Sequence, residues 1–166
     1  MPDQSGISRS GKDAEDRFIV LTGAKATTSK ARGDAVLDGR EVEVKRVKKT
    51  TINQVRPLKY LPLVLYQWTT DRWFVIPAHR IVLDTARKTR GQHTEIAFES
   101  VDFSLKSYEA FECSPEDLRS TVLARAEEAD QYPKLKEAME SLLAELQTTA
   151  RSHREKVATI LREYGL

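Results

Sequence analysis

Two acidic residues and a lysine in this sequence are spaced so that they could act together on a phosphodiester or hold a metal ion. They lie in the segment Asp34–Lys49, DAVLDGREVEVKRVKK, whose Asp38-Gly39 dipeptide suits a two-residue type I′ turn with positive φ at both central residues. That turn predicts two short antiparallel strands and places Asp34 opposite Glu43. Lys45 falls on the same face as Glu43, because side chains alternate along a strand. Directly opposed carboxylates repel each other, so a divalent cation between them would offset their charges.

This arrangement resembles the core of the PD-(D/E)xK nucleases, the restriction-endonuclease-like superfamily. The resemblance rests on Asp34, the DG hairpin and the ExK element Glu43-Val44-Lys45, in that order. Glu15 adds a further match, because many of these enzymes carry a glutamate on the helix before the hairpin. Gly33 stands where the family pattern often has proline. The resemblance covers roughly residues 10 to 80.

The resemblance implies a magnesium-dependent endonuclease. Asp34, Glu43 and the Val44 carbonyl would hold Mg²⁺, which prefers oxygen ligands. Lys45 would position or deprotonate the attacking water, and Glu15 would orient a water or a second ion. A compact chain within this superfamily suggests a type II restriction-type enzyme that cuts double-stranded DNA as a homodimer. Two alternatives stay open: a repair or recombination nuclease such as a Holliday junction resolvase, and a non-catalytic DNA-binding module with a vestigial fold.

Basic residues gather after the hairpin, although the formal net charge of the whole chain is only +2. Between residues 40 and 59 they are Arg40, Lys45, Arg46, Lys48, Lys49, Arg56 and Lys59, against Glu41 and Glu43. A basic stripe beside a carboxylate pair suits a phosphodiester substrate. The amides of Asn53 and Gln54 are of the type that bonds base edges. The residues predicted to contact DNA are Lys30, Arg32, Lys48, Lys49, Asn53, Gln54 and Arg56, and the basic loop 87–93 is a second place where DNA could be held.

Local patterns predict the elements that position these residues. The expected helices are 11–22, a stretch that opens at Pro77-Ala78, 115–129, 133–148 and 151–163. The expected strands beyond the hairpin are 61–68, 72–76 and 94–105, and the last has either a bulge or a division into two separate strands near Glu99-Ser100. A polar loop is predicted for 24–33 and a short helix or turn for 52–60.

These elements predict an α/β fold with a central mixed sheet flanked by helices, restriction-endonuclease-like, with a helical C-terminal region. Residues 1–113 would form the catalytic core, and residues 114–166 a helical extension that packs on the core or forms a dimer interface.

Composition limits the class of protein. A chain of 166 residues with 40% hydrophobic and 31% charged residues is typical of a single soluble domain. Cys113 is the only cysteine, which excludes an internal disulfide or a thiolate metal cluster. No apolar run approaches the ~20 residues of a membrane span, and no N-terminal apolar segment resembles a signal peptide. We therefore expect a cytoplasmic protein without a membrane partner.

Overall fold

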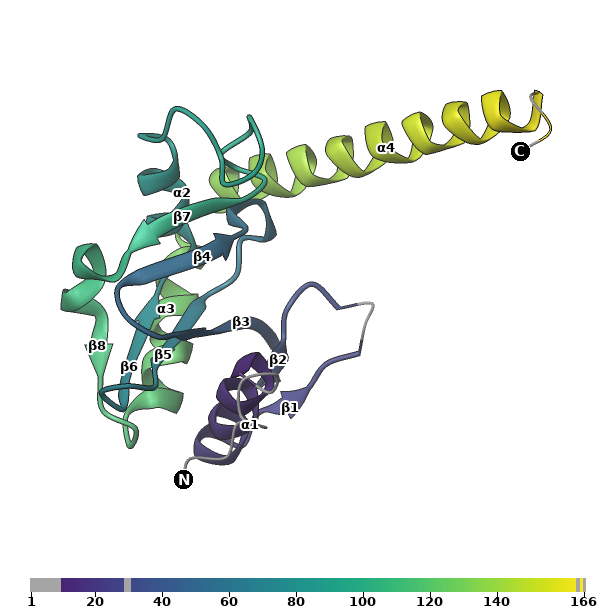
Figure 1. The fold of residues 1–166 in the computed structure, drawn as a ribbon. Helices are drawn as coiled ribbons and strands as arrows, with labels where there is room; N and C mark the ends of the chain where they lie inside the picture. Colours follow the sequence, from purple (N-terminus) through teal and green to yellow (C-terminus); the bar gives the residue numbers. More distant parts are fainter. Residues whose placement is uncertain (1–9, 29–30, 164, 166) are drawn as a thin grey trace.

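The computed structural model describes residues 10–28, 31–163 and 165, which form an α/β fold around a mixed sheet (Figure 1). The sheet has six strands in the order β1-β2-β3-β5-β6-β8. Strands β3 and β5 run parallel and all other neighbours are antiparallel, which confirms the predicted mixed sheet. The strands of this sheet are β1 (Lys25–Ala26), β2 (Ala35–Leu37), β3 (Arg40–Val47), β5 (Leu63–Gln67), β6 (Arg72–Ile76) and β8 (Glu112–Cys113).

A two-stranded antiparallel ribbon and several helices complete the fold. The ribbon consists of β4 (Thr51–Val55) and β7 (Val101–Ser104). The α-helices are α1 (Ser10–Thr22), α2 (Ala78–Thr85), α3 (Leu118–Asp130) and α4 (Pro133–Glu163). The 3-10 segments of the described residues are η2 (Pro57–Lys59) and η3 (Leu105–Phe111).

The hairpin of β2 and β3 has the predicted register. Its pairs are Ala35 with Val42, Val36 with Glu41 and Leu37 with Arg40. Asp38 and Gly39 have φ of 48° and 79°, as a type I′ turn requires. The sequence therefore determines this part of the site locally.

The sheet is buried on both faces. On one face, α1 and α3 pack through Phe18 and Leu118 against Trp73. On the other face, the ribbon packs through Ile52 against Phe74. A third cluster joins the base of α4 to η2 and α2. Alternate residues of β5 and β6 belong to the two main clusters, which explains why both strands are almost continuously apolar.

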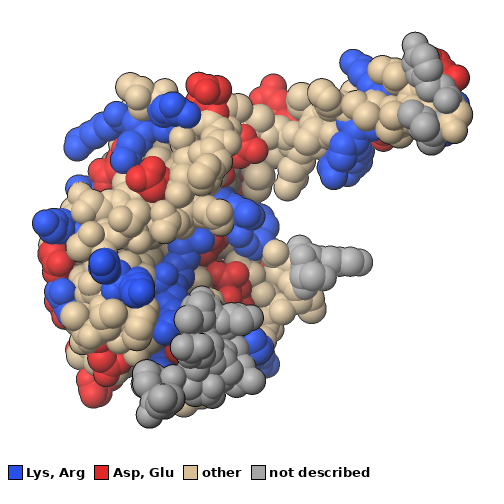
Figure 2. Space-filling model, in the orientation of Figure 1, with Lys and Arg blue, Asp and Glu red and all other residues tan. Residues whose placement is uncertain are grey.

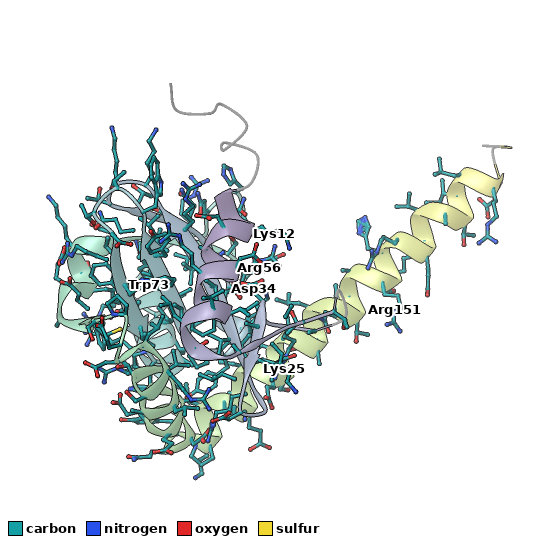
Figure 3. The ribbon with its side chains drawn as sticks, turned by 90° about the horizontal axis from the view of Figure 1, so that it is seen from below. Lys12, Lys25, Asp34, Arg56, Trp73 and Arg151 are labelled. Carbon is teal, nitrogen blue, oxygen red and sulfur yellow. The ribbon has the colours of Figure 1, made fainter. Side chains whose placement is uncertain are left out.

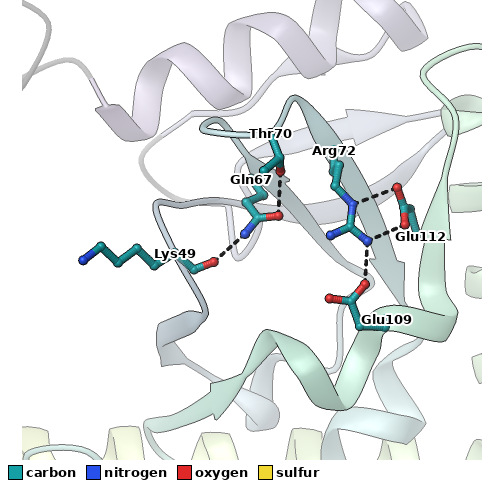
Figure 4. Close-up of polar contacts among 6 residues, drawn as sticks. All are labelled: Lys49, Gln67, Thr70, Arg72, Glu109 and Glu112. Carbon is teal, nitrogen blue, oxygen red and sulfur yellow. Dashed lines mark hydrogen bonds and ion pairs between the residues drawn. The ribbon is translucent and has the colours of Figure 1, made fainter.

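Polar contacts fix the ends of the central strands (Figure 4). The amide of Gln67, at the end of β5, donates to the Lys49 carbonyl and accepts a hydrogen bond from the Thr70 hydroxyl. Arg72, at the start of β6, binds Glu109 and Glu112. The turn after β3 and the segment η3–β8 are thereby tied to the sheet.

The short helix or turn predicted over 52–60 is correct only in part. The 3-10 turn η2 forms at its end, but 51–55 is the strand β4. Ile52 and Val55 are both buried although three residues apart, which is a helical spacing in the sequence. A register shift lies between them in the pairing with β7, and Gln54 there has φ of 53°. The irregularity brings both apolar side chains to one face of a strand.

Two other boundaries also differ from the prediction. Only 101–104 of the predicted strand 94–105 is extended, because 92–100 forms turns around the buried Gly91. The predicted loop 24–33 contains the two-residue strand β1, which pairs with β2.

The two helices predicted over 133–148 and 151–163 are a single helix, α4, of 31 residues. Neither glycine nor proline separates them. The hydroxyls of Thr148 and Thr149 donate to the carbonyls of Ala144 and Glu145 within the helix, so these threonines do not interrupt it. In the described part of the chain, no helix combines the length and the apolar character needed to span a membrane.

Candidate active site

Asp34 lies one residue before β2 and is tied to β3 by two hydrogen bonds. Its N–H donates to the Val42 carbonyl at 2.8 Å, and its Oδ2 accepts from the Val44 N–H at 2.8 Å. Because β2 begins at Ala35, the carboxylate takes the place that a strand carbonyl would occupy. The hairpin therefore fixes both the backbone and the side chain of Asp34.

Gly33 allows this close approach. A Cβ atom at this position would lie 2.8 Å from the Val42 carbonyl oxygen and 2.9 Å from the Val42 nitrogen. The Gly33 carbonyl also accepts a hydrogen bond from the Thr27 hydroxyl at 2.7 Å. A proline here, as in the family pattern, would collide with the backbone of β3.

Glu43 is the most enclosed of the predicted catalytic side chains, with 9% of its side chain exposed. Its Oε1 lies 3.2 Å from the Nζ of Lys45, and its Oε2 lies 3.0 Å from the Nζ of Lys59. Lys45 comes from the same strand, as the ExK spacing predicts. Lys59 comes from η2, where Pro57 begins the 3-10 turn and Tyr60 ends it with a left-handed φ of 52°. Two lysines therefore offset the charge of this carboxylate.

Asp34, Glu43, Lys45 and Lys59 line a polar pocket of about 380 Å³. Glu15 reaches it from α1, as predicted. Burial raises the pKa of the Glu15 carboxyl above its ordinary value, and the nearby charge of Asp34 raises it further. The pocket is lined by Gly11, Glu15, Asp34, Glu43, Val44, Lys45, Arg46, Ile52, Asn53, Gln54, Arg56 and Lys59. All the predicted catalytic and metal-binding residues are thus brought together.

The donors in this pocket suit Mg²⁺. Magnesium in proteins is commonly held by one or two carboxylates, with waters and substrate phosphates completing the shell. Asp34 and Glu43 supply two carboxylates, and an ionised carboxylate can accept more bonds than the contacts made here. Within residues 10–28, 31–163 and 165, no three His, Cys, Asp or Glu side chains form a metal-binding group. Any metal here would therefore depend on two carboxylates, backbone oxygen and non-protein ligands.

The residues predicted to contact DNA fall into separate places. Asn53, Gln54 and Arg56 line the pocket, and Figure 3 shows Arg56 close to Asp34 beside α1. Arg32 lies further along, with its guanidinium 3.7 Å from Glu41 and 3.6 Å from Glu140. The exposed Lys48 and Lys49 follow β3 and are not among the pocket-lining residues, and Lys30 lies outside the described residues. Figure 2 shows basic and acidic side chains meeting where this face is hollowed.

A glutamine from the distant loop 86–100 supports two of the residues that line the pocket, Asn53 and Gln54. The Oε1 of Gln92 accepts from the Gln54 N–H at 2.7 Å, and its Nε2 donates to the Asn53 Oδ1 at 3.0 Å. The basic residues predicted as a second DNA contact, Arg87, Lys88, Arg90 and His93, flank it in the sequence and are exposed.

The sequence did not identify two residues of this site, Lys59 and Gln92. Lys59 was visible only as one of several basic residues after the hairpin, because its approach to Glu43 depends on the crossover from β3 to β5. Gln92 is brought to the pocket by the pairing of β4 with β7, which is a long-range contact. The one local signal for Gln92 in the sequence is the preceding Gly91, which is buried in the structure.

No protein-family model, curated protein or solved structure gave a significant match to the chain.

Proposed function

We propose that this chain is a Mg²⁺-dependent DNA endonuclease with a PD-(D/E)xK site and a restriction-endonuclease-like fold. The observation that carries the proposal is the buried Glu43 carboxylate, which is paired with Lys45 and lines the same pocket as Asp34. A charged group is seldom buried unless it is paired or has a chemical role. The Glu43–Lys45 pair faces a pocket that is also lined by Arg56, and arginine is a side chain well suited to binding phosphate.

In this mechanism, Asp34, Glu43 and the Val44 carbonyl would hold Mg²⁺. The ion would supply polarisation of the scissile phosphate and make a water more acidic. Lys45 would position the attacking water or take its proton, and Lys59 would offset negative charge that develops on the phosphate. Arg56 would bind a phosphate of the strand.

Double-stranded DNA is the proposed substrate, and a type II restriction-type enzyme is the first candidate role. The repair or recombination nuclease remains the second candidate, because the same site would serve it. A survey of cut sites on plasmid DNA separates the two: discrete fragments favour restriction, and nicking at structural distortions favours repair.

A homodimer is part of the proposal, and α4 provides its support. The distal part of this helix, 147–163, is exposed throughout and projects beyond the rest of the chain (Figure 1). Most of the stability of a helix in a protein comes from packing of its apolar face, and Val157, Ile160 and Leu161 are 44%, 53% and 44% exposed on this part of α4. The first half of α4 (133–148) has three glutamates and two lysines and is slightly acidic, and the second half (149–163) has four lysines or arginines and two glutamates and is slightly basic. Antiparallel pairing of two copies would match these charges and cover the apolar residues.

The proposed catalytic role is tested with Lys45→Ala. A group that moves a proton in the transition state contributes about 10²–10⁴-fold to the rate, so single-turnover cleavage of a plasmid with Mg²⁺ should slow by at least about 100-fold. DNA binding in Ca²⁺ should stay close to that of the wild type. Lys106→Ala is the matched control, because Lys106 is exposed on η3 and is not among the pocket-lining residues. Cleavage by Lys45→Ala at the wild-type rate would refute the assignment.

A further inference from the structure

A second hollow continues from the polar pocket and shares Gln54, Arg56 and Lys59 with it. Its volume is about 660 Å³, which lies within the ~300–1,000 Å³ range of small-ligand pockets. We call it the side groove. Its walls come from residues after β1, the end of β4, the segment η2, the loop before β7 and the middle of α4.

The side groove combines an apolar surface with amide side chains. Leu58, Leu143 and Leu146 contribute apolar area, and the last two are only half-buried. Gln54 and Gln92 bring amides to the same hollow, and amides pair well with the edges of nucleobases. In a duplex, the faces of the bases are stacked and their Watson–Crick edges are paired. An apolar surface with adjacent amides therefore suits a base that is unstacked and unpaired.

The charge of the side groove fits a DNA strand. Arg32, Arg56 and Lys59 line it, and the acidic residue among its described lining is Glu99. Arg56 and Lys59 also line the polar pocket, so the two hollows share a basic junction. If the scissile phosphate of a DNA strand lies near Glu43, the neighbouring phosphate of that strand would lie near Arg56 and Lys59.

The amide wall is held in an uncommon backbone conformation. Gln54 has φ of 53°, a left-handed value that is infrequent for residues other than glycine. Gln92 secures it by accepting the Gln54 N–H, and the Gln92 N–H in turn donates to the Ser100 carbonyl at 2.8 Å. A Cβ at Gly91 would lie 2.6 Å from the Ser100 carbonyl oxygen, so this loop is tightly packed. Backbone conformations of this kind cluster at functional sites.

We propose that the side groove binds an unpaired nucleotide of the DNA strand next to the scissile phosphate. The preferred substrate is then DNA in which at least one base beside the cut is unstacked, as in a bulge or a flap, and this preference favours the repair or recombination nuclease over the restriction-type enzyme. This inference rests on the proposed function, whose site supplies the scissile position.

The test measures DNA binding without metal, so that cleavage plays no part. Three fluorescein-labelled probes are compared by anisotropy in EDTA: a single-stranded oligonucleotide, a perfect duplex, and the same duplex with a three-nucleotide bulge. The wild-type protein should bind the bulged duplex and the single strand about tenfold more tightly than the perfect duplex, since one bound base contributes roughly that factor.

Leu146→Glu places a carboxylate in the side groove and should remove this preference, so that the bulged and perfect duplexes bind with equal affinity. Leu142→Glu is the matched control on the same helix, because Leu142 is 41% exposed and is not among the residues that line the side groove. Gln92→Ala is a second variant, which should reduce the preference without adding charge. Thermal melts establish that each variant is folded.

Equal wild-type affinity for the bulged and perfect duplexes overturns the inference. Loss of preference in Leu142→Glu as strongly as in Leu146→Glu also overturns it, since the effect would then be one of charge alone. The proposed catalytic site can fail separately: if Lys45→Ala cleaves normally while the bulge preference persists, the assignment of Lys45 is wrong and that of the side groove stands. If Lys45→Ala is inactive and the preference is absent, only the side groove assignment is wrong.

Discussion

Replacing Asp34 separates its structural role from its proposed catalytic role. The Oδ2 of Asp34 accepts the N–H of Val44, a residue that is 4% exposed. Asp34→Ala leaves that buried N–H without this acceptor, whereas Asp34→Asn keeps an oxygen in the same place. Both substitutions remove a negative charge close to Glu15. The alanine variant should therefore lose stability, and the asparagine variant should retain it.

The strength of the hydrogen bond from the Val44 N–H to Asp34 determines the expected loss of stability in Asp34→Ala. A bond to a charged acceptor contributes about 1.5–3 kcal/mol, and leaving a buried donor unpaired costs a similar amount. One kcal/mol shifts the melting temperature of a chain of this size by about 2–4 °C. Asp34→Ala should therefore melt about 3–12 °C below the wild type. Asp34→Asn should melt at or above the wild-type temperature at pH 7, because relief of the repulsion with Glu15 offsets the weaker neutral hydrogen bond.

The assay is thermal unfolding in EDTA at pH 7, monitored by circular dichroism, together with plasmid cleavage in Mg²⁺. Under the proposed function both variants should fail to cleave, although only one is destabilised. If Asp34→Ala is as stable as the wild type, repulsion among the carboxylates outweighs the hydrogen bond, and the structural reasoning fails. If Asp34→Asn is as unstable as the alanine variant, the charge itself holds the hairpin.

Two further predictions concern charge and assembly. A carboxyl whose pKa is raised on folding stabilises the fold most when it is neutral, and this contribution is lost as the pH rises above the ordinary value of about 4.3 through the folded value. Glu15→Gln should therefore raise the melting temperature at pH 7.5 and leave it unchanged near pH 3.5 in EDTA, and an equal effect at both pH values would contradict this. Ile160→Asp should convert a dimer into a monomer in analytical ultracentrifugation, because it places a charge in the proposed helix contact. A dimer that persists unchanged would place the interface elsewhere.

Local signals predicted the centre of the fold. The DG turn requires positive φ at two adjacent residues, and few sequences other than Asn-Gly or Asp-Gly accept this readily. This turn alone predicts the register of β2 and β3, without any long-range contact, and the structure has that register. The strand β6 has the predicted bounds, because its apolar run lies between a turn and Pro77. Where local chemistry allows one conformation, the sequence predicts the structure closely.

Long-range contacts decided the parts that were predicted wrongly. Ile52 and Val55 have a spacing that fits a helix, and only pairing with β7 makes them one face of an irregular strand. The break predicted between 148 and 151 does not form, because no glycine or proline ends α4 there. The hydrogen bond from the Gln54 N–H to Gln92 joins residues 38 positions apart and depends on the pairing of β4 with β7.

The charges of the site also depend on long-range contacts that the sequence does not reveal. The sequence predicts that Asp34 and Glu43 face each other and that a divalent cation between them offsets their charges. If repulsion between the two carboxylates dominated, removing either one would leave the fold no less stable. In the structure, Lys45 and Lys59 approach the two oxygens of Glu43, and the Val44 N–H bonds Asp34. Removal of Glu43 would leave two lysines close together without their shared partner. Like charges in a partly buried site repel strongly, so each carboxylate should support the fold rather than strain it. A pattern of residue types identifies which charges meet, but the sign of their net effect depends on the partners that folding adds.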